Sequence, residues 1–354
     1  MDNKKINVLV TAVGGRSVGY QILESLKLKK NNYRIITTDM DAFSPGLYEA
    51  DKAYLLPPAN STSYIPRMIK IIKKEKIQAV LPGSQPETVA ISKSKNLLLK
   101  NGAIPIVNPF EMTRICFDKK LLYDLLTKNR ILTPYTVDLD RLEKAKNMEF
   151  PLIIKPAKNS SGSKNVHIIK DLNELSVLFE QLRKENVQLL AQEYVGDENE
   201  EYTVGIIIGK DGRVIDSIVM KRYLTGLSRG EEKKINGRDY VLSTGYSQGY
   251  FVKQKEVQDY CEKVAKIVGA RGPLNIQCRR GKKGVYIFEI HPRFSGSASM
   301  RALMGFNESH YLIRNFLGME KLKRIPHKLG YAVIRKFSNT VVKTKDLGRM
   351  KLSQ

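Results

Sequence analysis

The chain has 354 residues, of which 42% are hydrophobic and 27% are charged, as in an ordinary globular protein. This length allows about two or three domains with cores of their own. Three cysteines (Cys116, Cys261 and Cys278) form no metal-ligand spacing, the N-terminus does not match a signal peptide, and no stretch approaches the roughly 20 apolar residues that span a bilayer. We therefore expect a cytoplasmic protein with no membrane segment.

The balance of charge is unusual, because 60 Lys and Arg against 36 Asp and Glu leave a formal net charge of +24. The basic residues are scattered, and the densest surplus lies in residues 321–354, with ten Lys or Arg and one acid, Asp346. No RNP-like aromatic pattern, zinc finger or basic zipper accompanies them. We therefore do not expect a nucleic-acid partner, and a bound polyphosphate would also match this charge.

The first part of the chain alternates between strand and helix patterns. Strands are predicted over 6–14, 33–41, 79–83 and 104–108, and helices over 17–27 and 63–77. This alternation predicts a parallel sheet. Gly14, Gly15 and Gly19 lack the G-x-G-x-x-G spacing, so they favour a tight strand-to-helix turn over a nicotinamide site, although Asp39 ends the second strand where a ribose-binding acid would stand.

A second unit begins near Arg114 and changes character after Glu200. Its first half predicts a helix over 118–130, strands over 150–156, 167–169 and 187–195, and a helix over 171–185. Its second half predicts a hairpin over 200–222, a mobile charged loop over 224–241, a helix over 255–269, a hairpin over 272–296 and helices to about residue 320. Residues 330–342 predict a strand that returns to the core.

Two local motifs carry chemistry. The small-polar loop "AKNSSGSKNV" (157–166) follows Lys155 and could bring backbone N–H groups and lysines to phosphate oxygens, although it is not a Walker loop. In the second hairpin, Gln277 on one strand and Glu289 and His291 on the other could converge on one face, with Arg293 just beyond. A carboxylate there suits Mg²⁺ and an arginine suits phosphate, but a solvated hairpin with an ordinary ion pair is the alternative.

Taken together and in this order, the motifs over 114–320 resemble the ATP-grasp superfamily, most of all its carbamoyl phosphate synthetase-like branch with stand-alone ligases. Residues 1–113 resemble the Rossmann-like α/β domain that precedes it. The resemblance implies two α+β subdomains that clamp ATP, an N-terminal one over 114–195 with a phosphate lid and a C-terminal one over 196–320 with a metal site. The basic segment 321–354 would pack back on the core.

The same resemblance implies site residues by motif. Nucleotide contacts would come from Lys119, Lys155, the lid residues Ser160, Ser161 and Gly162, the hinge residues Glu193, Tyr194 and Val195, and the ribose-binding acid Glu201. Metal ligands would be Gln277, Glu289 and His291, holding two Mg²⁺ ions or Mn²⁺. The family's usual last ligand is an asparagine in E-x-N-P-R, and imidazole suits Mn²⁺ better than Mg²⁺.

The activity that the resemblance implies is an ATP-dependent carboxylate–amine ligase, which works through an acyl phosphate and releases ADP and phosphate. Lys155, Glu289 and Arg293 would be catalytic, and the family is commonly dimeric. Position and charge suggest substrate contacts from Lys221, Arg222, Arg229, Ser295 and Arg301. Two alternatives stay open at this point: phosphorylation of a small acid such as carbamate, and a non-catalytic nucleotide-binding protein with a weakened metal site.

Overall fold

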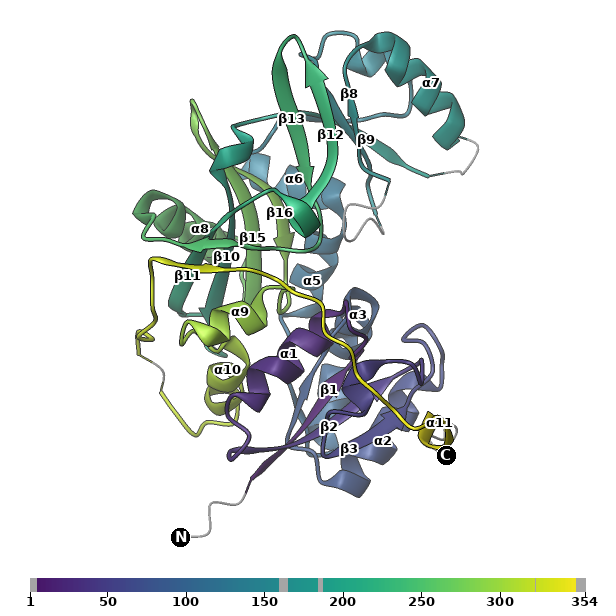
Figure 1. Ribbon diagram of the computed structural model, residues 1–354, viewed down its shortest axis with the longest axis vertical. Coiled ribbons are helices and arrows are strands. Elements are labelled where there is room, and N and C mark those ends of the chain that lie inside the picture. The colour runs from purple at the N-terminus through teal and green to yellow at the C-terminus, as the bar shows by residue number, and fades with distance from the viewer. Residues whose placement is uncertain (1–4, 159–164, 184–186, 322, 348–354) are drawn as a thin grey trace.

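The computed structural model describes residues 5–158, 165–183, 187–321 and 323–347. An α/β domain forms the lower part of the molecule in Figure 1, and three antiparallel sheets with their helices lie above it. Within the described ranges, no helix has both the length and the apolar character that crossing a membrane requires.

The lower domain is built on a parallel sheet with the strand order β3-β2-β1-β4-β5, as the alternating pattern predicted. Its strands are β1 (Ile6–Thr11), β2 (Tyr33–Asp39), β3 (Lys52–Leu55), β4 (Ala79–Leu81) and β5 (Ile104–Pro105). Its helices are α1 (Val18–Lys27), α2 (Tyr64–Glu75), α3 (Gln85–Lys93) and α4 (Lys95–Lys100). Gly19 lies so close to the carbonyl of Thr11 that a Cβ there would stand 2.1 Å from it, which explains the glycine in this strand-to-helix turn.

The central strand β1 shows why both faces of this sheet are covered. Val8 and Val10 point into one core, which they share with α1, while Leu9 points into another, which it shares with α2. The core on the α1 side also contains Ile207 and Phe306 from the upper part of the molecule. The lower domain and the larger upper sheet are therefore joined by a common hydrophobic core.

Two helices, α5 (Phe110–Phe117) and α6 (Lys119–Lys128), lead into a small antiparallel sheet. Its strands, in the order β6-β9-β7-β8, are β6 (Thr136–Asp138), β9 (Leu189–Glu193), β7 (Leu152–Pro156) and β8 (His167–Ile169). The helix α7 (Leu172–Arg183) covers this sheet, and Leu175 and Phe179 pack against Leu152 and Ile154.

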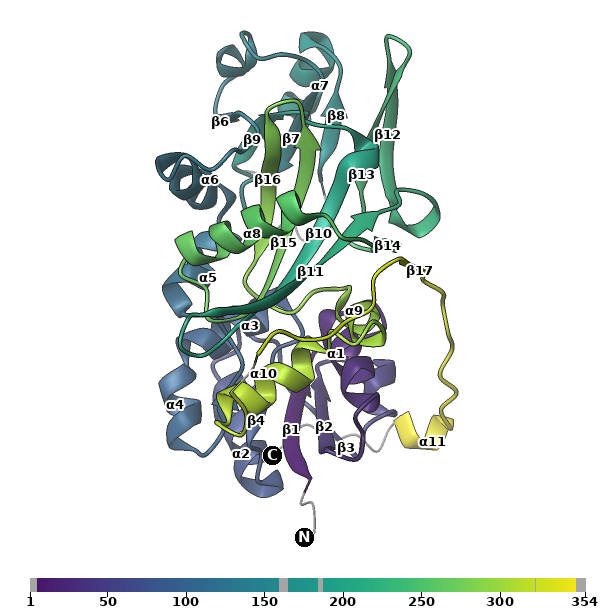
Figure 2. The same ribbon diagram turned by 90° about the vertical axis from the view of Figure 1, so that its left-hand side faces the viewer.

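The larger antiparallel sheet has the order β16-β15-β10-β11-β14-β17. Its strands are β10 (Glu201–Ile208), β11 (Val214–Arg222), β14 (Gly249–Phe251), β15 (Gly272–Gly281), β16 (Gly284–His291) and β17 (Tyr331–Val333). The helix α8 (Lys255–Ile267) lies across one face (Figure 2). The helices α9 (Ala298–Leu303) and α10 (Glu308–Phe316) lie between the other face and α1, and α11 (Thr344–Leu347) lies near the end of the chain. The mixed α/β architecture that the resemblance implied is confirmed.

The prediction of a mobile loop over 224–241 was wrong, because this stretch contains a two-stranded sheet of β12 (Arg229–Ile235) and β13 (Arg238–Ser243). Both residues between the strands have positive φ, 49° at Asn236 and 80° at Gly237, as a primed hairpin turn requires. The Asn-Gly pair therefore indicated a hairpin correctly, whereas the charged composition of its strands had suggested a loop.

Candidate active site

A pocket of about 680 Å³, including the solvent at its mouth, lies where the small sheet faces the larger one. The predicted site residues that line it are Lys119, Lys155, Glu193, Val195, Glu201, Gln277 and Glu289. The lid residues Ser160, Ser161 and Gly162 lie outside the described residues. The pocket therefore draws on α6, all three antiparallel sheets and the connection that follows β9.

Lys155 enters the pocket from β7 as a buried cation. Its Nζ donates to the hydroxyl of Tyr123 at 2.8 Å and to Oε1 of Gln192 at 2.7 Å. Tyr123 in turn donates to the carbonyl of Phe288 at 2.7 Å, which ties Lys155 to the strand that carries Glu289. Burial lowers the pKa of Lys155 to about 8, against the opposing effect of Glu289, so its charge depends on an anionic neighbour.

The β15–β16 hairpin brings the predicted metal ligands together. Gln277 stands directly opposite Glu289 in the strand register, and Asn275 stands opposite His291. Glu289 and His291 are two residues apart on β16 and share a face, with Oε2 of Glu289 at 3.1 Å from Nε2 of His291. The other ring nitrogen, Nδ1 of His291, lies 3.4 Å from a guanidinium nitrogen of Arg293.

Electrostatics keep Glu289 ionised. Burial opposes its charge, but the Nε2 contact from His291 and the positive charges of Lys119 and Lys155 together hold its pKa well below the usual value. Burial also lowers the pKa of His291, against the effect of Glu289, so the imidazole is neutral and able to donate a lone pair near pH 7. Arg293 has a pKa lowered to about 10 by burial, with Glu289 opposing the shift, and it stays charged at neutral pH.

These donors fit a hard divalent cation that shares its coordination with phosphate oxygens. One carboxylate, one amide and one neutral imidazole are too few for an all-protein cage, and the described residues hold no group of three or more His, Cys, Asp or Glu arranged around a metal. Mg²⁺ commonly keeps several positions for phosphate and water and takes only one or two carboxylates from the protein. Gln277, Glu289 and His291 would therefore hold such an ion only together with a nucleotide.

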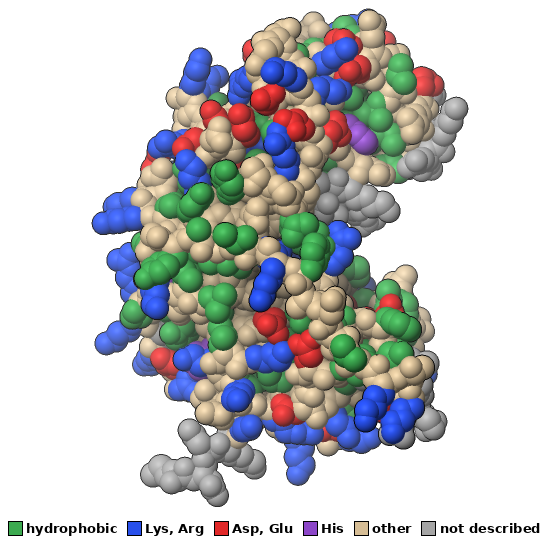
Figure 3. Space-filling model, viewed as in Figure 1, with side chains coloured by type: hydrophobic (Ala, Val, Ile, Leu, Met, Phe, Trp, Pro, Cys, Tyr) green, Lys and Arg blue, Asp and Glu red, His purple; other side chains and the backbone are tan. Residues whose placement is uncertain are grey.

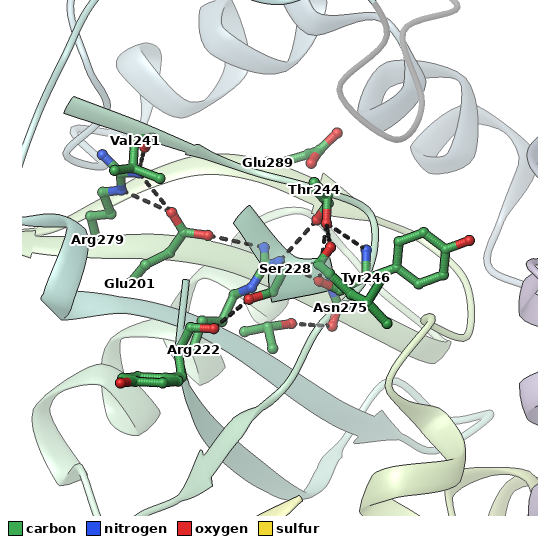
Figure 4. A network of polar contacts seen from close by, with 12 residues as sticks. Glu201, Arg222, Ser228, Val241, Thr244, Tyr246, Asn275, Arg279 and Glu289 are labelled. Carbon is green, nitrogen blue, oxygen red and sulfur yellow. Dashed lines mark hydrogen bonds and ion pairs between the residues drawn. The ribbon is translucent and has the colours of Figure 1, made fainter. Parts of the chain in front are cut away.

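Glu201, at the start of β10, is almost completely buried between two arginines (Figure 4). Its Oε1 accepts from Nη1 of Arg222 at 3.0 Å and its Oε2 accepts from Nε of Arg279 at 2.9 Å. Burial opposes the charge of Glu201, but Arg279 and Arg222 outweigh it and lower the pKa. Arg222 also donates to the carbonyls of Thr244 and Tyr246 at 2.9 and 3.0 Å, so this network fixes the chain beside the pocket.

The hinge between the sheets follows β9. Glu193 and Val195 line the pocket, and Tyr194 is directed away from it, where its hydroxyl donates to the carbonyl of Val241 at 3.1 Å. The N–H of Tyr194 donates to the carbonyl of Pro151 at 3.3 Å. Val195 is therefore better placed than Tyr194 for a backbone N–H contact with a ligand.

Lys119 stands at the first turn of α6, where Asp118 caps the helix by accepting from the N–H of Leu121 at 3.2 Å. The backbone N–H of Lys119 donates to the carbonyl of Ala157 at 3.1 Å, which joins α6 to the segment after β7. Burial lowers the pKa of Lys119 and Glu289 raises it, so these two side chains influence each other across the pocket.

Several of the suggested substrate residues are bound to other side chains of the protein. Arg222 is 2% exposed and bound to Glu201, and Arg301 is fully buried with its Nη1 donating to Glu308 at 2.7 Å. Lys221 forms an ion pair with Glu200 at 2.8 Å, and Arg229 forms one with Glu232.

Ser295 is also buried, and its hydroxyl lies 2.7 Å from that of Ser297. Arg222 and Arg301 each form an internal ion pair, with Glu201 and Glu308 respectively. Their guanidinium groups are enclosed together with these carboxylates and do not face a substrate.

Sequence reasoning missed four residues that support the site: Tyr123, Gln192, Asn275 and Arg279. Asn275 and Arg279 alternate with Gln277 along β15, so the strand period could have found them. Tyr123 lies four residues after Lys119 on α6, on the same side of the helix. No local signal marks Gln192, whose contact with Lys155 spans 37 residues.

Two models of known protein families match different parts of the chain. A family model described as "PylC-like, N-terminal domain" matches residues 8–107, and one described as "ATP-grasp in the biosynthetic pathway with Ter operon" matches residues 185–337. Residues 185–337 therefore belong to an ATP-grasp domain. This model covers the predicted hinge, Glu201 and the β15–β16 hairpin, and the resemblance seen in the motifs is thereby confirmed.

Three individual proteins illustrate the similarity. The carbamoyl phosphate synthase large chain of Clostridium acetobutylicum is 25% identical over 338 residues, which cover 89% of this chain and 27% of that one. The chain thus spans about a quarter of that relative's length.

Among solved structures, the N5-carboxyaminoimidazole synthetase of Staphylococcus aureus complexed with ADP has a TM-score of 0.67 at 12% identity, covering 92% of this chain and 82% of that one. The L-amino acid ligase of Bacillus licheniformis has a TM-score of 0.62 at 16% identity, covering 89% and 74%. These two structures support the fold.

Proposed function

We propose that this chain is an ATP-dependent ligase that joins a carboxylate to an amine through an acyl phosphate, releasing ADP and phosphate. The observation that carries the proposal is the convergence of the half-buried Lys119 and the buried Lys155 with the ionised Glu289 in one pocket. Cations held beside a carboxylate away from bulk solvent suit a polyphosphate that brings its own metal ion, because each charge then has a partner.

The positions of these groups suggest which part of ATP each one contacts. Lys119 and Lys155 neutralise the phosphates, and Glu193 with the backbone at Val195 holds the base at the hinge. Glu201 is fixed by two arginines and can accept from a ribose hydroxyl with its remaining lone pairs. Gln277, Glu289 and His291 would hold Mg²⁺ or Mn²⁺, and such an ion would supply charge neutralisation to the phosphates.

The reaction needs no covalent protein residue. A carboxylate oxygen of the substrate attacks the γ-phosphorus of ATP, and the bond to the β-phosphate oxygen breaks to release ADP. An amine then attacks the acyl carbon and expels phosphate, with loss of a proton from nitrogen. The chain's contribution is positioning and charge, since Lys155 and Arg293 stabilise the charge that develops on the transferred group.

The relatives agree with this class of chemistry. The Clostridium acetobutylicum relative is named a carbamoyl phosphate synthase and the Bacillus licheniformis structure an L-amino acid ligase. A third relative, from Prochlorococcus marinus, is named a formate-dependent phosphoribosylglycinamide formyltransferase and is 23% identical over 301 residues. All three names are compatible with activation of a small acid, which supports the proposal without naming the substrate.

Hydroxylamine trapping tests the acyl phosphate directly. The protein is incubated with ATP, Mg²⁺ or Mn²⁺, pools of amino acids, sugar acids or other carboxylates, and hydroxylamine in place of the amine. We expect a hydroxamate and equimolar ADP with at least one pool. If ADP and a phosphorylated acid form and neither an amine nor hydroxylamine changes their amounts, the activity is simple phosphorylation and not ligation. ATP binding without turnover in any pool would contradict an enzymatic role.

A further inference from the structure

The end of the chain crosses the lower domain and encloses a second cleft. After β17 pairs with β14, residues 334–347, here called the C-terminal strap, pass in front of α1 to reach α11 (Figure 1). The cleft between the strap, the Gly15–Arg16 turn, α1 and Tyr246 measures about 1280 Å³ including the solvent at its mouth. It is separate from the nucleotide pocket, because the two share no lining residue.

The side chains around this strap cleft are basic and aromatic. Arg16, Arg335 and Lys336 line it, and no Asp or Glu is among its lining residues. The guanidinium of Arg16 lies 4.9 Å from the ring centroid of Tyr246, and the ring of Phe337 lies 6.4 Å from the same ring on the strap side. Neither Arg16 nor Lys336 forms an ion pair with any carboxylate of the described residues.

Carboxylates lie near the lower-domain side of this cleft, but none of the described ones pairs with Arg16 or Lys336. Glu49 accepts from Tyr20 at 3.0 Å and from Thr340 at 2.8 Å, but Lys27 pairs with it at 2.5 Å and balances its charge. Tyr48 lines the cleft from the lower domain; burial raises the pKa of its phenol, and Asp346 and Asp41 raise it further. The basic group at Arg16 and Lys336 therefore faces a cleft that would receive an anion.

Arg335 connects the strap cleft to the proposed reaction site. Its Nη2 donates to the carbonyl of Gly296 at 2.5 Å, its Nη1 to Oε1 of Gln21 at 3.1 Å, and its Nε to the carbonyl of Ser247 at 3.3 Å. Gly296 follows Arg293 in the loop after β16, the strand that carries Glu289. Arg335 thus fixes the strap against the loop that follows the β15–β16 hairpin. The strap cleft therefore lies next to the end of the strand that carries Glu289.

We propose that the strap cleft binds the non-reacting end of the acid substrate, and that this end carries a second anionic group, a carboxylate or a phosphate, held by Arg16 and Lys336. The inference rests on the ligase function proposed above. The reacting carboxylate would extend past the loop at Gly296 toward Arg293. The strap acts as a specificity element, because it supplies Lys336 directly and is held in place by the three bonds of Arg335.

Ligand-observed NMR on the full-length protein tests this inference independently of turnover. Saturation-transfer difference spectra are recorded with glutarate, methylphosphonate and propionate as probes. We expect transfer to glutarate, to methylphosphonate, or to both, and none to propionate; the probe that binds distinguishes a carboxylate site from a phosphate site. In an Arg16→Ala/Lys336→Ala double variant, the dissociation constant of the probe that binds should rise about tenfold or more, because a charge-assisted contact is lost.

Two controls sharpen the result. Lys343→Ala removes an exposed charge of the strap that does not line the cleft and should leave binding unchanged, whereas Arg16→Lys/Lys336→Arg should preserve it. Absence of transfer in the natural protein, equal transfer to propionate, or transfer that survives the double alanine variant would overturn the inference. Binding that behaves as expected in a protein that releases no ADP would leave the cleft assignment standing and refute the ligase function instead.

Discussion

Lys155 is a buried ammonium group whose charge depends on what stands opposite it. Its hydrogen bonds to Tyr123 and Gln192 hold it in place, but both partners are neutral. Burial brings its pKa to about 8, so the free protein loses this charge just above physiological pH. A nucleotide phosphate would favour the protonated form, which links ATP affinity to pH.

ATP affinity should therefore fall as pH rises through 8. Only the protonated lysine attracts the phosphates, so with a pKa of about 8 in the free protein the dissociation constant should rise about tenfold between pH 7 and pH 9. Titration calorimetry with ATP at constant ionic strength measures this. Lys155→Arg should show a smaller dependence over the same range, and a steep fall that is identical in both proteins would assign the effect to another group.

Glu201 stabilises the fold through two buried arginines as well as facing the pocket. Its pKa is lower in the folded chain than in the unfolded one, so the ion pairs contribute stability above the unfolded value of 4.5, and this contribution is lost as pH falls through the folded value. Glu201→Gln leaves Arg222 and Arg279 without a charge partner, which costs about 3–5 kcal/mol at pH 7.

Urea unfolding at pH 7 and pH 4 tests this prediction. The difference in unfolding free energy between the natural protein and Glu201→Gln should be largest at pH 7 and should narrow toward pH 4. There the Glu201 carboxylate of the unfolded natural chain takes up a proton while that of the folded chain stays ionised, which favours unfolding. A difference that stayed constant across this range would show that Glu201 contributes by packing rather than by charge.

At the scale of elements, the β15–β16 hairpin shows what the sequence could predict. The strand period and the short turn between Gly281 and Gly284 are local signals, and they were enough to place Glu289 and His291 on one face. The β12–β13 hairpin was missed because its strands are charged rather than β-branched. The arginines that hold Glu201 lie 21 and 78 residues away, and no local pattern encodes such pairings.

The β12–β13 hairpin also fastens the small sheet to the larger one. Oε1 of Glu231 accepts from the N–H of Ile168 at 2.9 Å and its Oε2 lies 3.2 Å from Nδ1 of His167, while Lys233 pairs with Glu174 at 2.6 Å. These contacts join β12 to β8 and α7 beside the pocket. They offer a means of controlling how firmly the small sheet is held over a nucleotide.

Breaking this connection should loosen β8. In a Glu231→Ala/Lys233→Ala variant, amide exchange at residues 167–169 should accelerate about fivefold, which corresponds to about 1 kcal/mol for partly exposed ion pairs, and the KM for ATP should rise. Hydrogen-exchange mass spectrometry of peptides from β8 measures it. Glu232→Ala changes the intervening residue of the strand and is the control; equal acceleration in the control would mean that the hairpin has simply unfolded.

At the scale of the whole molecule, the net charge of +24 is spread rather than gathered. Lys and Arg side chains occur over the upper, middle and lower parts of the face in Figure 3, among acidic ones. The shared core between the lower domain and the six-stranded sheet keeps this charged surface and both clefts on one framework. A field of this sign attracts small polyanions such as ATP and is screened by salt.

The rate of productive ATP capture should therefore depend on ionic strength. Between 20 and 200 mM KCl, kcat/KM for ATP should fall about threefold to tenfold, because the Debye length shortens from about 20 to about 7 Å, while kcat changes little. Steady-state ADP release measures both. An increase in kcat/KM with salt would show that the positive field does not guide the nucleotide.

ADP release by the natural protein and by Glu289→Ala is the most direct test of the proposed active site. The assay contains ATP, Mg²⁺ or Mn²⁺ and pools of acids and amines, with Glu256→Ala on the exposed surface of α8 as the matched control. We predict turnover that requires an acid, persists in Glu256→Ala and falls by about 100-fold or more in Glu289→Ala, because that variant lacks the carboxylate proposed to hold the metal ion. Turnover that survives in Glu289→Ala at the natural rate would contradict the assignment of this pocket as the catalytic centre.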